Sequence, residues 1–265
     1  MFLFGINSED KVSVADLKRG MKNGEFVFYY QPEFNLKTGE IIAVEALMRW
    51  NAPKGIIPPD QFIPVLESSK LIQEFTDFLF RQTLTDLKVI QNAGYPNVSM
   101  SVNLSAAQLT DKRLIPIVQT VLKETNTESK FLECEITESQ RLEFSDTQKD
   151  IFKELQDLGI SISIDDFGTG YSSFDYLRYL NINKLKVGCD FARSLQEGVK
   201  SREIFSLVIQ FGHILKVPVL AEGIETTEQK EWLEKNGCDY GQGFWFSRPL
   251  PLDQLIIFLE KKKEN

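Results

Sequence analysis

Eight short runs rich in β-branched and aromatic residues recur along the chain, and most are followed by a longer stretch with the spacing of an amphipathic helix. The expected strands are FVFYYQ at 26–31, EIIAVEAL at 40–47, VSMSVNLS at 98–105, FLECEIT at 131–137, SISIDDF at 161–167, NKLKVG at 183–188, VPVLAEG at 217–223 and CDYGQGF at 238–244. The expected helices are 72–93, 107–124, 146–158, 202–216, 227–236 and 252–261. This alternation is typical of βα units, and it predicts an α/β fold whose strands close into a (β/α)₈ barrel of the TIM type.

Polar side chains lie at or near the carboxyl end of each expected strand, which is where barrel enzymes place their functional groups. These residues are Gln31, Glu45, Asn103, Glu135, Asp165, Asp166, Lys186, Glu222 and Gln242. Side chains alternate between the two faces of a strand, so Ser161, Ser163 and Asp165 share one face and the intervening isoleucines share the other. Asp165 is therefore expected inside the barrel. The same alternation places Glu133 beside Glu135, nearer the strand start, where a structural role is favoured.

The acids of this set, together with Asn103, offer only oxygen donors. Such hard ligands suit Mg²⁺ or Mn²⁺. Adjacent aspartates such as Asp165 and Asp166 can bridge two cations, and paired cations stabilise the attacking and leaving oxygens in phosphodiester hydrolysis. Lys186 would lie among the carboxylates, where it could hold the attacking water or stabilise the phosphoryl oxygens. The alternative is a set of ordinary salt bridges at strand ends, which becomes less plausible with six such residues together.

Composition narrows the class of function further. The chain has one histidine and three cysteines without metal-ligand spacing, which excludes mechanisms that need two histidines and argues against a disulfide framework. Cys134 and Cys189 lie in strand-like runs and are expected to be buried thiols. A net charge of −8 argues against a nucleic-acid polymer as partner. We find no membrane segment and no signal peptide, so we expect a cytoplasmic protein.

The length of 265 residues fits a single barrel domain. We expect an N-terminal extension at 1–14, the barrel at 15–260 and a charged tail at 261–265. The roughly 20 residues before the barrel are too few for a sensory domain. Control would then come from a separate regulatory protein, from dimerisation or from a further part of the protein.

Several motifs resemble those of one known family, in the same order. They are EALMRW at 45–50, SVNLS at 101–105, ECEITES at 133–139, DDFGTGYSS at 165–173 and AEGIE at 221–225, supported by YQP at 30–32, PPDQFIPVLE at 58–67 and GQGFWFSRPLP at 241–251. Over residues 15–260 the chain resembles the EAL family of cyclic di-GMP phosphodiesterases. The resemblance implies a modified TIM barrel whose first strand is antiparallel to the others, and commonly a homodimer. It also implies hydrolysis of cyclic di-GMP to linear pGpG with Mg²⁺ or Mn²⁺, inhibited by Ca²⁺.

The same resemblance implies a role for individual residues. One metal would be bound by Glu45, Asn103, Glu135 and Asp165, and a second by Asp165, Asp166 and, through water, Glu222. The catalytic group would be Lys186, Glu222, Gln242 and Glu45, with Lys186 and Gln242 positioning the attacking water. The substrate would be bound by Gln31, Leu47, Arg49 and Gln242, with Arg49 on a phosphate. The loop after Asp166 would be anchored through Glu138, Gly168 and Gly170.

One position departs from the family pattern. The family usually reads LKID where this chain reads LKVG at 185–188, so Gly188 replaces an aspartate of the active site. Asp190 would share a face with Lys186 and Gly188 if the strand continued, which offers partial compensation. A second interpretation is therefore a degenerate EAL domain that binds cyclic di-GMP as a sensor. A third is an unrelated barrel enzyme that uses metals, with Lys186 as a base for enolisation.

Overall fold

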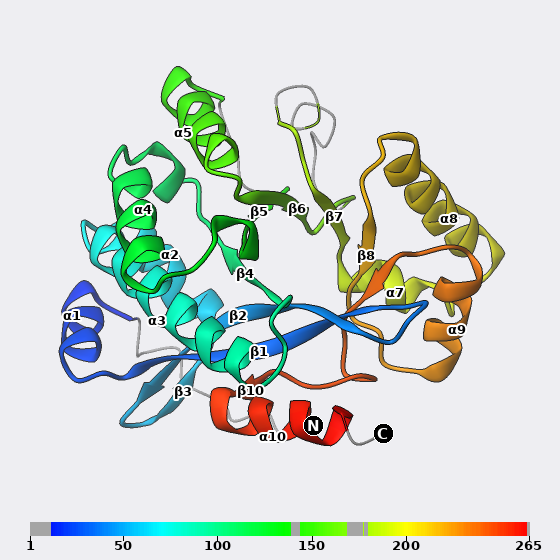
Figure 1. The fold of residues 1–265 in the computed structure, drawn as a ribbon, viewed down its shortest axis with the longest axis horizontal. Coiled ribbons are helices and arrows are strands. Elements are labelled where there is room, and N and C mark those ends of the chain that lie inside the picture. The colour runs from blue at the N-terminus through cyan, green and yellow to red at the C-terminus, as the bar shows by residue number, and fades with distance from the viewer. Residues whose placement is uncertain (1–11, 139–143, 169–176, 178–179, 264–265) are drawn as a thin grey trace.

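The computed structural model describes residues 12–138, 144–168, 177 and 180–263. Eight strands form a closed barrel with helices around the outside (Figure 1). The barrel strands are β1 (Phe26–Asn35), β2 (Ile41–Ala52), β4 (Ser99–Asn103), β5 (Leu132–Thr137), β6 (Ser161–Asp165), β7 (Lys184–Val187), β8 (Val219–Ala221) and β9 (Tyr240–Gly241). Each falls on one of the eight expected runs, so the predicted barrel is confirmed.

The first strand, β1, runs antiparallel to both of its neighbours, β2 and β9, whereas the other barrel neighbours pair in parallel. A short turn forces this direction, because only residues 36–40 separate β1 from β2 and a parallel pair needs a crossover of a dozen residues or more. Asn35 tightens the turn by accepting the backbone N–H groups of Lys37 and Thr38, both at 3.0 Å. Two short strands, β3 (Gly55–Ile57) and β10 (Leu250–Pro251), extend the sheet beside β2 and β1.

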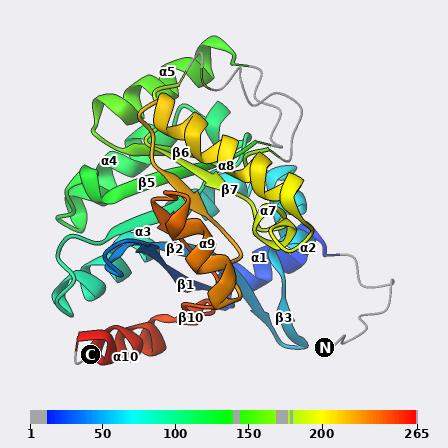
Figure 2. The same ribbon diagram turned by 90° about the vertical axis from the view of Figure 1, so that its right-hand side faces the viewer.

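The described helices cover the barrel from outside. They are α1 (Val14–Lys22), α2 (Pro59–Glu67), α3 (Ile72–Asn92), α4 (Leu114–Glu124), α5 (Asp146–Asp157), α7 (Cys189–Ser194), α8 (Val199–Ile214), α9 (Thr227–Lys235) and α10 (Leu252–Lys263), with 3₁₀ turns at Gln108–Thr110 and Ser129–Phe131. Helix α10 packs outside the barrel against β10 and β1, at the bottom of the views in Figures 1 and 2. No helix in the described ranges combines the length and the apolar run needed to cross a bilayer.

Three of these helices were not expected. Helix α2 starts with Pro59 at its first position and contains Pro64, so its proline content hid it, although proline is tolerated in a first turn. Helix α1 lies before the first expected strand and begins at a capping box formed by Ser13 and Asp16. Helix α7 has six residues, too few to show a periodic pattern.

The alternation along the strands is observed as predicted. Ile162 and Ile164 are buried against the surrounding helices, while Ser163 and Asp165 face the barrel interior. A second, smaller core joins α1, α2 and the start of α3 to the ends of β1 and β2, around the stacked rings of Phe26 and Trp50. The alternation along the strands therefore places the polar side chains inside the barrel, where they can form a common site.

Candidate active site

Lys186 on β7 is the centre of a cluster of charged residues inside the barrel. Its side chain is fully buried, and its Nζ lies 2.7 Å from Glu135 Oε2, 2.9 Å from Glu222 Oε1 and 3.3 Å from Glu45 Oε2. Burial alone lowers the pKa of this amine, but the three adjacent carboxylates outweigh burial and raise the pKa well above its usual value. Lys186 is therefore a permanent cation that donates hydrogen bonds.

Two neutral side chains donate hydrogen bonds to Glu45, in addition to its contact with Lys186. Asn103 Nδ2 donates to Glu45 Oε1 at 2.8 Å, and Gln242 Nε2 donates to Glu45 Oε2 at 2.9 Å. Gln31 Nε2 donates to the Ser247 carbonyl at 3.0 Å, and its Oε1 lies 3.3 Å from Gln242 Nε2. Burial raises the pKa of Glu45, but Lys186 and these donors outweigh it, so the net shift is downward and Glu45 stays ionised.

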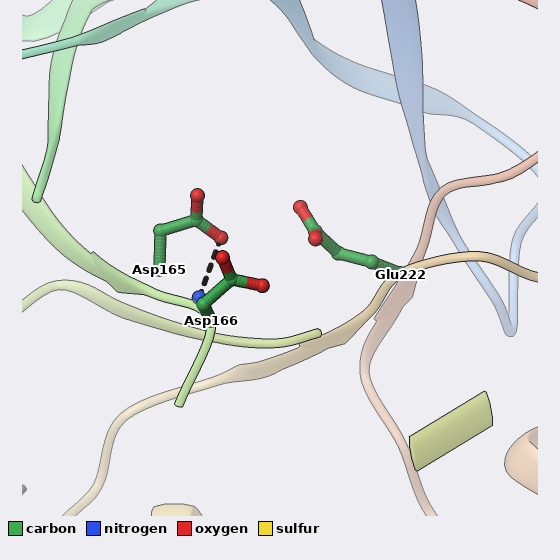
Figure 3. Close-up of side chains that lie close together, drawn as sticks. All are labelled: Asp165, Asp166 and Glu222. Atoms are coloured by element: carbon green, nitrogen blue, oxygen red, sulfur yellow. Dashed lines mark hydrogen bonds between the residues drawn. The ribbon is translucent and has the colours of Figure 1, made fainter. Parts of the chain in front are cut away.

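Three further carboxylates meet beside this group, as Figure 3 shows. One oxygen each from Asp165, Asp166 and Glu222 lies within 4.8 Å of the others. The backbone N–H of Asp166 donates to Asp165 Oδ1 at 2.7 Å. Burial, with the surrounding carboxylates, raises the pKa of Asp165 to about 6 and that of Glu222 to about 8, although Lys186 opposes both shifts.

This donor set fits hard divalent cations. Glu45, Glu135 and Glu222 contact the Lys186 ammonium group, and Asp165 and Asp166 lie beside Glu222, so the site has more carboxyl groups than one lysine can pair with. Glu135 Oε1 and Gln242 Oε1 are buried and accept no hydrogen bond within the described part of the chain. Buried acceptors are normally satisfied, so these oxygens are available to a cation or to a water molecule.

Glu138 links the carboxylates to the loop that follows them. Its backbone N–H donates to the Asp165 carbonyl at 2.9 Å, and its Oε2 accepts the Gly168 N–H at 2.6 Å. Gly168 has a φ of +91°, which side chains rarely allow. Glu138 and Gly168 are thus hydrogen-bonded to each other beside Asp165, and their role as a loop anchor stays a prediction; Gly170 is outside the described residues.

A cavity of about 250 Å³ opens over the cluster. Its lining includes Gln31, Glu45, Leu47, Asp165, Asp166, Glu222 and Gln242. Leu47 also lines a neighbouring apolar cavity of about 260 Å³, and Asn103 lines only this second cavity. Arg49 is outside both linings as far as the described residues go, and its Nη1 donates to the Met48 carbonyl at 2.9 Å. The structure therefore brings together the described site residues named above, with Arg49 at the edge.

A family model described as the EAL domain matches residues 14–249. The chain belongs to the EAL family. The "Signaling protein YkoW" of Bacillus subtilis is 36% identical over 97% of this chain, which covers 33% of that protein. The "Cyclic di-GMP phosphodiesterase RocR" of Pseudomonas aeruginosa is 32% identical over 93% of this chain and 63% of its own. The solved structure "PaMucR Phosphodiesterase, c-di-GMP complex" has a TM-score of 0.85 and 35% identity, and covers 91% of this chain and 98% of that one. The EAL domain thus spans about a third of the first of these relatives and under two thirds of the second.

Two residues of the EAL domain lie elsewhere than expected. Strand β7 ends at Val187 and α7 begins at Cys189, so the alternation stops before Asp190, whose side chain is 80% exposed and lies 3.5 Å from Arg193. The expectation that Asp190 shares a strand face with Lys186 and Gly188 is therefore wrong. Cys189 was expected to be a buried thiol in a strand, but it begins α7, is partly exposed and lines the cavity.

Sequence reasoning missed a second buried lysine. Lys184, also on β7, forms ion pairs with Glu33 and, at 2.8 Å, with Glu133. Glu133 therefore has the structural placement that was expected for it. The alternation of β7 could have indicated Lys184, because it shares a face with Lys186.

Proposed function

We propose that this EAL domain hydrolyses one phosphodiester bond of cyclic di-GMP and releases linear pGpG. The observation that carries the proposal is the position of Lys186. It contacts Glu45 on β2, Glu135 on β5 and Glu222 just after β8, and it adjoins the Asp165–Asp166–Glu222 cluster under an open cavity. Relatives named cyclic di-GMP phosphodiesterases and a similar structure with cyclic di-GMP bound support the choice of substrate.

Two cations, Mg²⁺ or Mn²⁺, would occupy the site, with Ca²⁺ as an inhibitor. Glu45, Asn103, Glu135 and Asp165 would hold one, and Asp165 and Asp166, with Glu222 through water, would hold the other. When bound, such a pair stabilises the attacking and leaving oxygens of the phosphodiester.

The protein's own groups would orient the reaction. The Lys186 ammonium and the Gln242 amide would hold the attacking water in line with phosphorus, and Lys186 would also donate to the phosphoryl oxygens. Glu222, with its pKa raised to about 8, is suited to taking up the proton of that water. Gln31, Leu47 and Arg49 would hold the substrate, with Arg49 turning toward a phosphate.

The raised pKa of Lys186 disfavours the enolising-enzyme interpretation. A lysine that acts as a base must lose its proton near neutral pH, which requires a lowered pKa. The carboxylates around Lys186 do the opposite.

The test is a chromatographic assay of the purified protein with cyclic di-GMP and Mg²⁺, Mn²⁺ or Ca²⁺. We expect pGpG with the first two metals and none with Ca²⁺ or with Asp165→Asn. Protein that binds cyclic di-GMP with Mn²⁺ but leaves it intact would refute the hydrolase proposal.

Gly188 favours a second candidate, a degenerate EAL domain that senses cyclic di-GMP. Binding without turnover is the result that would select it. Ready turnover that is lost in Glu45→Ala would dismiss it.

The assembly of the EAL domain is also a proposal. We propose a homodimer, controlled by a separate regulatory protein or by a further part of the protein, with the barrel at 15–260. Light scattering after size-exclusion chromatography will give the mass, and a monomer at working concentration would contradict the dimer.

A further inference from the structure

Tyr29 and Tyr30 are neighbours on β1, and their side chains point to opposite faces of the strand. Tyr30 is fully buried on the outer face, where its hydroxyl donates to Asp86 of α3. Alternation turns Tyr29 to the inner face, which it shares with Gln31. Tyr29 is half-buried and lies directly opposite Leu47 of β2, and both Gln31 and Leu47 line the cavity over the carboxylates. Tyr29 therefore lies at the edge of this cavity.

The ring of Tyr29 contacts the guanidinium group of Arg49. The distance from Arg49 Cζ to the ring centroid is 5.7 Å, and a cation within about 6 Å of a ring centroid is attracted to the ring face. The Met48 carbonyl accepts from Arg49 Nη1 at 2.9 Å, so the half-buried guanidinium group is held by two partners. That hydrogen bond uses one of its five N–H groups, and the planar fork can still donate to a phosphate.

The backbone under this pair is fixed by the sheet. Tyr29 pairs with Leu47 on one side and with Pro251 of β10 on the other, and Arg49 pairs with Val27 of β1. Side chains on strands are held more precisely than side chains on loops. Cavities for drug-sized ligands usually measure about 300–1,000 Å³, so a cyclic dinucleotide must extend beyond a cavity of about 250 Å³ and across its edge. Tyr29 and Arg49 form part of that edge.

We propose that Tyr29 is a positioning residue, whose ring holds the Arg49 guanidinium group at the cavity edge where it meets a phosphate of cyclic di-GMP. The inference rests on the proposed function, which places a substrate phosphate on Arg49. Without the ring, the Arg49 side chain has more conformations open to it in the free protein, and ordering it on binding lowers the affinity. Tyr29 acts through Arg49, so its contribution should vanish when Arg49 is removed.

A double-mutant cycle tests this proposal. Binding of cyclic di-GMP to the full chain is measured by calorimetry with Ca²⁺, and chromatography checks that the ligand stays intact. Tyr29→Leu removes the ring and should weaken binding by about three- to tenfold, between the effects of an exposed and a desolvated cation–π contact. In the Arg49→Met background, the same change should alter affinity by less than about twofold.

Two further variants separate this role from a general effect on the fold. Tyr29→Phe keeps the ring and removes the hydroxyl, and it should bind like the wild type. Tyr240→Leu removes a ring at the opposite end of the barrel, where Tyr240 pairs with Asn35, and it should leave the affinity unchanged. In the hydrolysis assay with Mn²⁺, Tyr29→Leu should raise KM by the same factor as the Kd and leave kcat near the wild-type value.

Circular dichroism and thermal unfolding will confirm that each variant is folded. The proposal is overturned if Tyr29→Leu binds like the wild type, if Tyr29→Phe binds as poorly as Tyr29→Leu, if the loss persists in the Arg49→Met background, or if the wild type does not bind cyclic di-GMP. A wild type that shows this coupling in binding but leaves cyclic di-GMP intact with Mn²⁺ would refute the hydrolase and leave the role of Tyr29 standing. Turnover with independent losses at the two positions would do the reverse.

Discussion

Two buried lysines lie two residues apart on β7, and they have different surroundings. We call Lys186 with Glu45, Glu135 and Glu222 the upper layer, and Lys184 with Glu33 and Glu133 the lower layer. Both ammonium groups are within 5% of complete burial. The upper layer adjoins Asp165 and Asp166 and lies under the cavity, whereas the lower lysine has two carboxylate partners, one of which also accepts from Ser101 Oγ at 3.4 Å.

Burial therefore does not distinguish a functional charge from a structural one in this barrel. The number of carboxyl groups around each lysine and their access to the cavity do distinguish the two. In the upper layer one lysine meets three carboxyl groups, with Asp165 and Asp166 beside them, while in the lower layer one lysine meets two. Four predictions can break or sharpen this distinction.

The largest effect is expected from Lys184→Met. Glu33 and Glu133 would be left as buried, unpaired acids, which should lower the free energy of unfolding by about 3–5 kcal/mol. The kcat of the folded variant should stay close to that of the wild type. Urea unfolding and the hydrolysis assay will measure the two quantities.

A matched variant controls for the lost charge. Glu33→Gln/Glu133→Gln/Lys184→Met removes all three charges of the lower layer and should recover much of the stability. Loss of turnover in folded Lys184→Met would show that the lower layer also takes part in function.

Lys186→Met should act on catalysis. The attacking water and the phosphoryl oxygens would lose their ammonium donor, and we expect kcat to fall by about 10²–10³-fold, as when one oxyanion donor is removed. Single-turnover kinetics with saturating Mn²⁺ will separate this loss from weaker cation binding. An unchanged kcat would remove Lys186 from the mechanism.

Cations should stabilise the upper layer selectively. Mn²⁺ at 100 times its Kd should raise the free energy of unfolding by about 2.7 kcal/mol, which is roughly 5–10 °C in Tm for a chain of this size. The shift should persist in Lys184→Met and disappear in Asp165→Asn. Equal shifts in all three proteins would place the cations elsewhere.

The smallest effect is a dependence on pH. Burial raises the pKa of Asp165 to about 6 and that of Glu222 to about 8, so each carboxyl keeps a proton below its pKa, and a cation must displace that proton. Mn²⁺ affinity should therefore rise between pH 6 and 8, by up to about tenfold per pH unit, and level off above pH 8. Calorimetric titrations will show this, and Glu222→Gln should flatten the upper part of the rise. Affinity that falls with pH would contradict it.

Much of this arrangement could be predicted from the sequence. Strand positions followed from the runs of β-branched residues, and the inward face of Asp165 followed from alternation. The antiparallel first strand came from the family resemblance, but the eight residues at 32–39 between the first two expected strands already made a parallel crossover too short.

The remaining contacts depend on how neighbouring strands are aligned in three dimensions. Alternation places Lys184 and Lys186 on the same face, but only the tilt of the barrel decides which glutamates each one meets. Gly188 and Asp166 are close in space but follow two different strands, so no local sequence pattern could have predicted their closeness. The inward turn of Asp165 could be read from one strand, while the ion pairs of Lys184 needed the neighbouring strands.

The reversed direction of β1 also decides how the polypeptide enters the barrel. Phe26, at the start of β1, pairs with Trp50, near the far end of β2, so β1 begins at the end where the parallel strands finish. Helix α1 consequently lies at the rim where the parallel strands end, and it packs on α2, whose Ile63 and Leu66 line the apolar cavity beside Leu47. The contact of α1 with α2 therefore joins the segment before β1 directly to the wall of this apolar cavity.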